Sequence, residues 1–366
     1  MMELRGYRLF RYTLPLKQPF TTHAGVLHER EGIIVELQDI DGRLGYGEGV
    51  AFAEPFYTSE TVASSWILLQ QSLLPLLFAG NVNHPTDVPK LLAGIVGNQM
   101  AKAAVEGAVW DLYAKQQNRS LASCIGGTRT KAKAGAVISL SDDLEQTIEM
   151  IRSQGFERAK LKVSKYNERQ AIERVKLIDP ELPLMIDGNG IYRDRDLPLL
   201  ADLDSLNLQM IEQPFPSGDI VLHQRLQDQM LTPVCLDETV ESWQDAWQAL
   251  ELGACRTINI KIGRVGGLTA AIRIHDLCQQ AGLPVWCGGM VETGISKAHN
   301  LALASLQGFS LPGDLSGSDR YFERDLLQEP LRVEKGSIQI PAKPGIGVEV
   351  DMDYLLHVSK EVKEGK

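Results

Sequence analysis

The sequence predicts an α/β protein built on a (β/α)₈ barrel of the TIM type, with an α+β module in front of it. From about residue 130 onward, short apolar runs recur, and each is followed by a segment with helical periodicity. The last residues of these runs lie 24 to 26 positions apart, at Val137, Lys162, Asp187, Glu212, Asp237, Lys261, Cys287 and Leu311. Eight units of about 25 residues fit the strand-and-helix repeat of a barrel. A doubly wound open sheet is the rival architecture, but no GxGxxG motif follows the first strand.

Antiparallel strands and helices are predicted before the barrel. Residues 3–13 alternate polar and apolar side chains, Gly32–Gln38 is rich in β-branched residues, and Leu44–Glu48 follows an Asp-Gly turn. Two later segments, Ser59–Ala79 and Gln99–Gln116, carry apolar residues at helical spacing. These segments predict an α+β module of about 125 residues.

The chain after the eighth run predicts more antiparallel sheet. A hairpin is expected over Leu331–Ile340, with its turn at Lys335–Gly336, followed by the segment PGIGVEVD at 344–351. We expect this tail to return to the first module. The predicted division is therefore 1–125 for the α+β module, 126–325 for the barrel and 326–366 for the returning C-terminal segment.

Composition and charge exclude several classes of function. The net charge is −10, and no basic stripe is visible, so we expect a small-molecule partner and no nucleic acid. The most apolar stretch, Trp66–Ala79, contains polar residues and a proline and is shorter than a membrane span requires, so no membrane is expected. The first residues show no secretory signal, which makes the cytoplasm the expected compartment. The five cysteines lack CxxC spacing and are expected to be reduced.

Three carboxylates follow three successive apolar runs. LMID ends at Asp187, MIE at Glu212 and VCLD at Asp237. Catalytic groups of barrels lie at the carboxyl ends of the strands, where neighbouring side chains converge on one mouth. Three acids at one mouth raise each other's pKa unless a cation holds them, and oxygen-only ligation suits Mg²⁺. One such acid alone could simply cap a helix, but three in register favour a divalent metal.

Lysines occur on both sides of these acids. Lys160 and Lys162 lie in AKLKV, and Lys261 lies in INIKI. Burial and neighbouring cations lower the pKa of a lysine, which can make it a base near neutral pH. Lys160 alone could equally be a lysine that reaches out to solvent. Because a metal stabilises an enediolate while a lysine takes the proton, the set predicts removal of a proton α to a carboxylate.

These residues lie in segments that resemble the enolase superfamily, in its muconate-lactonizing-enzyme-like subgroup, and more narrowly the o-succinylbenzoate synthase/N-succinylamino acid racemase family. The resemblance runs almost from end to end of the chain. It rests on KLK at 160–162, DGNG at 187–190, IEQP at 211–214, LDE at 236–238, NIKIGRVGG at 259–267, WCGGMVETG at 286–294 and LPGDLSGSDRYF at 311–322. It implies a modified (β/α)₈ barrel under an α+β capping domain built from both ends of the chain.

The resemblance also implies roles for individual residues. Mg²⁺, for which Mn²⁺ can substitute, would be held by Asp187, Glu212 and Asp237, with Asn189 and Glu238 around these ligands. The catalytic residues would be Lys162 as the proton-abstracting base, Lys261 as its partner on the opposite side of the barrel, and Lys160 in a supporting role. Contacts to substrate are expected from Phe20, Phe52, Arg264 and Met290. Arg264 matches an arginine of the branch that contains racemases, whereas Phe52 and Val137 depart from the racemase-like pattern.

The function implied first is that of an o-succinylbenzoate synthase, a dehydration in menaquinone biosynthesis. The alternative is N-succinylamino acid racemase, alone or as a second activity, because it uses the same parts with Lys162 and Lys261 as two bases. Dipeptide epimerase is disfavoured, since GGMVETG and GDLSGSDRYF match the succinyl-handling branch better. A barrel that binds a carboxylated metabolite without turnover is the non-enzyme alternative, and the intact lysines argue against it. The family also implies a small-molecule carboxylate substrate and a homo-oligomer.

Overall fold

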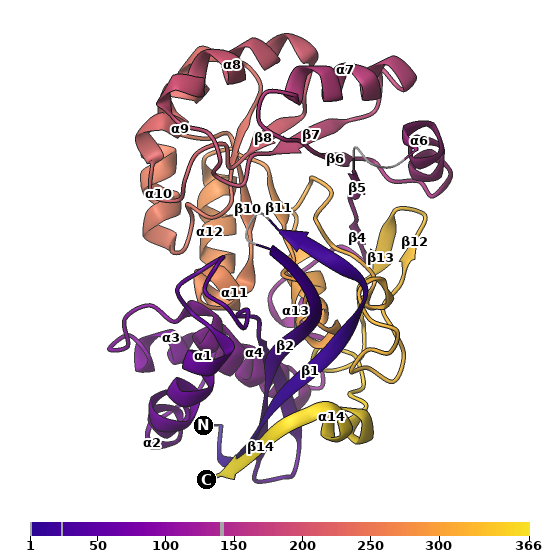
Figure 1. The fold of residues 1–366 in the computed structure, drawn as a ribbon. Coiled ribbons are helices and arrows are strands. Elements are labelled where there is room, and N and C mark those ends of the chain that lie inside the picture. The colour runs from indigo at the N-terminus through magenta and orange to yellow at the C-terminus, as the bar shows by residue number, and fades with distance from the viewer. Residues whose placement is uncertain (1, 23–24, 140–142) are drawn as a thin grey trace.

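The computed structural model describes residues 2–22, 25–139 and 143–366, and Figure 1 shows helices packed on each of its two larger sheets. The first sheet is antiparallel, with strand order β14-β1-β2-β3. Its strands are β1 (Leu4–Thr22), β2 (Gly25–Asp39), β3 (Leu44–Gly49) and β14 (Ser359–Gly365). Gly42, with φ of 84°, forms the predicted turn between β2 and β3.

The helices of the capping domain follow β3 in the sequence. They are α1 (Val62–Leu68), α2 (Leu74–Ala79), α3 (Val88–Leu91), α4 (Gln99–Gln116) and α5 (Leu121–Cys124). The bounds of α4 agree with the predicted Gln99–Gln116. A Cβ atom on Gly47 would overlap the carbonyl oxygen of Ala104, so glycine at that position lets β3 lie directly on α4.

The segment Val62–Ala79 is one continuous helical stretch in which a π-helical turn, Leu69–Leu73, joins α1 to α2. By length and composition alone it would suit a membrane span, with a mean hydropathy of 1.4 over 18 residues, 39% of which are buried. It is four residues longer than Trp66–Ala79, the stretch that was judged from the sequence to be too short for a membrane span. Its buried side chains, such as Trp66, share a core with Leu9 of β1 and Ala104 of α4. We therefore interpret it as a core helix.

The second sheet is parallel and confirms the predicted barrel-like α/β fold. Its strand order is β11-β10-β9-β8-β7-β6-β5. The strands are β5 (Ala136–Ile138), β6 (Ala159–Lys162), β7 (Leu184–Asp187), β8 (Met210–Glu212), β9 (Val234–Leu236), β10 (Thr257–Ile260) and β11 (Val285–Cys287). The helices around it are α6 (Leu144–Ser153), α7 (Glu168–Ile178), α8 (Leu197–Asp202), α9 (Ile220–Gln229), α10 (Trp243–Glu251), α11 (Ile262–Val265), α12 (Leu268–Gln280) and α13 (Gly294–Ala304). The first seven predicted run ends coincide with strand ends to within one residue.

The prediction of an eighth strand ending at residue 311 is wrong. The described residues form no strand there, only an isolated parallel bridge between Gly313 and Ala134. On the other side, the backbone N–H of Asp314 donates to the carbonyl oxygen of Cys287 at the end of β11, at 3.1 Å. Pro312 has no N–H to donate to a ladder, which explains why pairing is so short. The segment nevertheless closes the barrel between its first and last strands.

The C-terminal segment only partly follows the prediction. The hairpin β12 (Val333–Glu334) and β13 (Ser337–Gln339) turns at the predicted Lys335–Gly336, but it pairs with β4 (Lys131–Lys133) at the start of the barrel and not with the first sheet. Residues 344–351 form isolated bridges, because positive φ angles at their glycines interrupt extended backbone. After α14 (Met352–Val358), β14 pairs with β1. We keep the division into 1–125, 126–325 and 326–366 as a proposal.

One carboxylate of the capping domain caps a barrel helix. Glu106 of α4 is buried and accepts hydrogen bonds from the backbone N–H of Thr269 at 3.2 and 3.4 Å, in the first turn of α12. Gly267 before that helix has a φ of 134°, and a Cβ atom there would overlap the Glu106 carboxylate. Burial raises the pKa of Glu106 to about 7 from its ordinary 4.5, although these hydrogen bonds oppose the rise.

Glu106→Gln is expected to change how stability depends on pH. A carboxyl whose pKa is raised in the folded state stabilises the protein when protonated, and this contribution disappears as the pH rises from 4.5 through 7. The difference in unfolding free energy between wild type and Glu106→Gln should therefore shift by up to about 3 kcal/mol against the wild type over this range. Urea unfolding of both proteins from pH 4.5 to 8 measures it. A difference that stays constant with pH would contradict the assignment.

Candidate active site

The candidate residues lie at one end of the parallel sheet. Lys162, Asp187 and Glu212 are the last residues of β6, β7 and β8, and they are paired in register. Asp237 directly follows β9, and Lys261 directly follows β10. Three strands, β7, β8 and β9, separate β6 from β10. The two lysines therefore lie on opposite sides of the mouth, with the three carboxylates between them.

Lys160 lies among acidic side chains rather than in solvent. Its Nζ atom is 3.1 Å from Oδ2 of Asp187, 2.6 Å from Oε2 of Glu212 and 2.5 Å from Oδ2 of Asp314. Burial alone would lower the pKa of Lys160, but the three carboxylates raise it well above its ordinary value. The indole of Trp286 lies below, with its ring centroid 5.3 Å from the ammonium. Lys160 is thus held as a buried cation.

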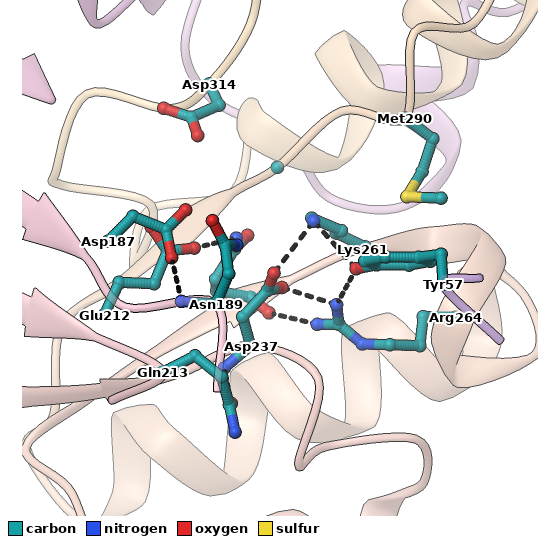
Figure 2. Close-up of polar contacts among 12 residues, drawn as sticks. Tyr57, Asp187, Asn189, Glu212, Gln213, Asp237, Lys261, Arg264, Met290 and Asp314 are labelled. Carbon is teal, nitrogen blue, oxygen red and sulfur yellow. Dashed lines mark hydrogen bonds and ion pairs between the residues drawn. The ribbon is translucent and has the colours of Figure 1, made fainter. Parts of the chain in front are cut away.

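Asp237 is held by a second group of cations (Figure 2). Its Oδ2 atom is 2.9 Å from Nζ of Lys261, and its Oδ1 accepts a hydrogen bond from Nη1 of Arg264. The hydroxyl of Tyr57 accepts from both cations, at 3.0 Å from Lys261 and 2.8 Å from Arg264. Burial would raise the pKa of Asp237, but Arg264 and Lys261 hold it below its ordinary value. Burial would lower the pKa of Lys261, but Asp237 and Tyr57 raise it.

Glu212 and Glu238 have carboxyl oxygens without hydrogen bonds. Oε1 of Glu212 accepts from Nδ2 of Asn259 at 2.9 Å, whereas its Oε2 contacts Lys160 outside hydrogen-bond geometry. Burial and Asp187 raise the pKa of Glu212. Oε2 of Glu238 is buried without a hydrogen-bond partner, and burial with Asp237 raises the pKa of Glu238 to about 7. Asn189 is exposed, and its backbone N–H donates to Oδ1 of Asp187 at 3.0 Å.

The four expected substrate contacts are in different surroundings. The ring centroid of Phe20 lies 5.9 Å from Nζ of Lys162. Phe52 and Met290 belong to one apolar cluster between the capping domain and the barrel, against which Tyr57 packs. Arg264 is 2% exposed, and it donates to the protein carbonyls of Val240 and Asn259 as well as to Asp237 and Tyr57. Its donors are therefore already used within the protein, which favours a positioning role over direct contact with substrate.

A pocket of about 210 Å³ opens beside these groups. Its lining residues are Phe56, Tyr57, Asn189, Gly190, Arg193, Gln213, Pro216, Ser217 and Glu238. The pocket thus contains both residues that were predicted to surround the metal ligands, together with the tyrosine that contacts Lys261.

Comparison with known proteins decides the family. Residues 5–126 match the mandelate racemase/muconate lactonizing enzyme N-terminal domain, and residues 142–354 match the enolase C-terminal domain-like family. The o-succinylbenzoate synthase of Geobacillus kaustophilus is 48% identical over 92% of this chain and 91% of its own. The chain belongs to the o-succinylbenzoate synthase/N-succinylamino acid racemase family of the enolase superfamily. A crystal structure of an enolase superfamily member from Listeria innocua agrees, with 41% identity, coverage of 100% and 99% of the two chains, and a TM-score of 0.96.

The racemases of this family are also similar to the chain. The N-succinylamino acid racemase of Thermus thermophilus is 37% identical and covers 98% of both chains. Several o-succinylbenzoate synthases match at 40–48%, so the similarity is greater on the synthase side of the family.

Members of this family depend on a divalent metal, and the donor set at the mouth suits one by its chemistry. Asp187, Glu212 and Asp237 supply only oxygen donors, and Oε2 of Glu212 has no hydrogen bond to lose. Within the described part of the chain, however, no three His, Cys, Asp or Glu side chains converge closely enough to hold one ion. The cations explain this spacing, because Lys160 draws Asp187 and Glu212 to one side while Lys261 and Arg264 hold Asp237 on the other.

Sequence reasoning missed four polar residues of this enolase superfamily site. Tyr57 and Asp314 contact the lysines, and Asn259 binds Glu212. Gln213 is fully buried, and its Oε1 accepts from the backbone N–H of Asp237 at 2.9 Å, which fixes the end of β9 to the end of β8. Gln213 directly follows the end of a predicted strand, and Asp314 directly follows the Pro-Gly bend after the last one. These positions at the strand ends could have marked both residues as candidates for the site. Tyr57 lies in a capping-domain loop whose neighbours the sequence does not reveal.

Proposed function

We propose that the protein is an o-succinylbenzoate synthase that dehydrates the cyclohexadiene precursor of o-succinylbenzoate in menaquinone biosynthesis. The observation that carries this proposal is the pair Lys162 and Lys261, which lie across the mouth of the barrel with three carboxylates between them. Relatives with this name match at 40–48% identity over most of the chain, which supports the proposal.

Lys162 supplies the base in this proposal. Its neutral amine takes the proton α to the substrate carboxylate, and the electron pair of the broken C–H bond enters an enediolate. The electron pair then expels hydroxide from the neighbouring carbon, and the Lys162 ammonium gives its proton to that hydroxide. Water is released and the neutral amine is restored. Lys261, held by Asp237 and Tyr57, provides a fixed cation on the opposite side.

The proposed metal is Mg²⁺, with Mn²⁺ able to substitute, held by Asp187, Glu212 and Asp237. A divalent ion there would supply positive charge beside the substrate carboxylate as negative charge develops. Asn189 and Glu238 would orient these ligands from the adjoining pocket.

Phe20, Phe52 and Met290 are proposed to form the apolar wall against substrate. The burial of Phe52 and Met290 between the two domains and the position of Phe20 beside Lys162 support this role. Arg264 is proposed to act on substrate only through Asp237 and Tyr57. The family acts on small carboxylates. That the protein works in the cytoplasm, as a homo-oligomer, without nucleic acid or membrane, remains a proposal.

N-succinylamino acid racemase is the second candidate, since a lysine is present on each side of the mouth and a racemase is 37% identical. Racemisation requires Lys261 to remove and deliver protons, whereas dehydration needs it only as a cation. Arginine keeps the charge but does not release a proton near neutral pH.

We expect dehydration to be the faster reaction of the wild type. The test compares kcat/KM for the cyclohexadiene precursor with kcat/KM for racemisation of N-succinylamino acids, on one preparation. Lys261→Arg is the matched variant, and it should eliminate racemisation while some dehydration survives if the longer side chain fits. A racemase kcat/KM more than about tenfold higher than the synthase value, a gap of about 1.4 kcal/mol, would make the second candidate the function.

A further inference from the structure

Lys160 forms ion pairs with three carboxylates. Its ammonium contacts Asp187, Glu212 and Asp314 at 2.5–3.1 Å, and its residue is 9% exposed. Two of these three partners are proposed metal ligands. Its contact with Glu212 is to Oε2, the oxygen that has no hydrogen bond and is therefore available to a cation. Lys160 and a divalent metal would thus be drawn to the same oxygens.

A second set of contacts keeps Lys160 in this place. Asp314 pairs with Lys160 through Oδ2 and with Nη2 of the fully buried Arg158 through Oδ1. Trp286 contacts both cations, with its ring centroid 4.6 Å from Cζ of Arg158 and 5.3 Å from Nζ of Lys160. These contacts involve no proposed metal ligand. The contacts with Asp314 and Trp286 would therefore hold Lys160 in place even if Asp187 and Glu212 no longer bound it.

We infer that the Lys160 ammonium is a built-in counter-ion of the metal ligands, which stabilises them without metal and competes with the divalent ion for Asp187 and Glu212. Buried carboxylates at one mouth repel one another strongly unless a cation lies between them. A positive charge in direct contact with two ligand oxygens also opposes the entry of a second cation. Lys160 therefore stabilises the metal-free protein and lowers its affinity for the metal. This inference rests on the metal site of the proposed function.

The experiment compares Lys160→Met with wild type and with Lys162→Met. Lys162 lies two residues away at the same mouth and is exposed, so Lys162→Met makes the same substitution without removing an ion pair to a metal ligand within the described part of the chain. Mn²⁺ binding is titrated by calorimetry on the full-length protein stripped of metal. We expect Lys160→Met to bind Mn²⁺ at least about tenfold more tightly than wild type, and Lys162→Met to differ from wild type by less than about threefold.

Thermal unfolding gives a second readout that does not depend on catalysis. Without metal, Lys160→Met should have a lower Tm than wild type, and saturating Mn²⁺ should raise its Tm by more than it raises that of wild type. If the variant is unfolded without metal, Mn²⁺ should fold it. A variant that no Mn²⁺ concentration folds would overturn the inference, as would unchanged or weaker Mn²⁺ binding in a folded Lys160→Met. Wild type that binds no Mn²⁺ would instead overturn the proposed metal site itself, and the inference with it.

Discussion

Lys162→Ala is expected to lose about 10²–10⁴-fold in kcat, the range that follows removal of a positioned acid–base group. The residue ends β6, its Nζ atom lies beside Phe20, and no ion pair joins it to an acid within the described part of the chain. Lys261→Ala should lose a similar factor, because the fixed cation across the mouth disappears. Steady-state dehydration of the cyclohexadiene precursor measures both effects.

Two controls separate catalysis from folding in this series. Lys133→Ala removes an exposed lysine of β4 that is paired with Glu157 and lies before the first strand of the parallel sheet, and it should keep normal turnover. Exchange of the substrate α-proton with deuterated solvent should stop in Lys162→Ala, while circular dichroism should remain that of wild type. Near-normal turnover in either Lys162→Ala or Lys261→Ala would show that the role proposed for that lysine, as base or as fixed cation, is wrong.

Exhaustive chelation is expected to abolish turnover altogether, and added Mg²⁺ should restore it. Without a divalent ion, the charge that develops on the substrate carboxylate loses its main counter-charge. Asp187→Asn should reproduce the loss at ordinary Mg²⁺ concentration, because an amide oxygen is a weaker ligand than a carboxylate. Turnover at saturating precursor, before and after dialysis against chelator, is the measurement.

The chelated protein should remain folded, since Lys160, Lys261 and Arg264 already neutralise the carboxylates. Far-UV circular dichroism of the dialysed sample checks this point. Full turnover after chelation and dialysis would remove the metal from the proposal, and turnover that is not restored by Mg²⁺ would indicate damage other than metal loss.

The parts of the fold that were predicted from sequence are those encoded by local pattern. Strand ends of the barrel are marked by an apolar run that stops at a charged side chain, which placed Asp187 and Glu212 on neighbouring strands correctly. The eighth strand was wrong because the run up to residue 311 looks like the others, whereas Pro312 prevents the ladder from extending. The hairpin Leu331–Ile340 was predicted as a hairpin, but its partner β4 depends on tertiary packing that no local pattern carries.

The same distinction applies to the site. Lysines and acids at strand ends could be proposed because barrel geometry brings all strand ends together. The contacts that set their charge could not, because Tyr57 and Asp314 come from a capping loop and from the irregular eighth segment. Arg264 was expected to contact substrate, and that contact stays a prediction; its hydrogen bond to Asp237 was not foreseen, because it depends on which way a buried side chain points.

The pairing of β14 with β1 has a consequence for how the protein is made on the ribosome. β1 ends at Thr22, but the strand that covers its outer edge begins at Ser359, more than 300 residues later. The capping sheet therefore stays incomplete throughout synthesis of the barrel, with the backbone groups of β1 unpaired along that edge. An uncovered strand edge invites pairing with other chains, and closing so long a loop is slow. Nascent chains that stall after the barrel but before β14 should consequently be the species most dependent on chaperones, although every proposed ligand and lysine of the mouth has by then been made.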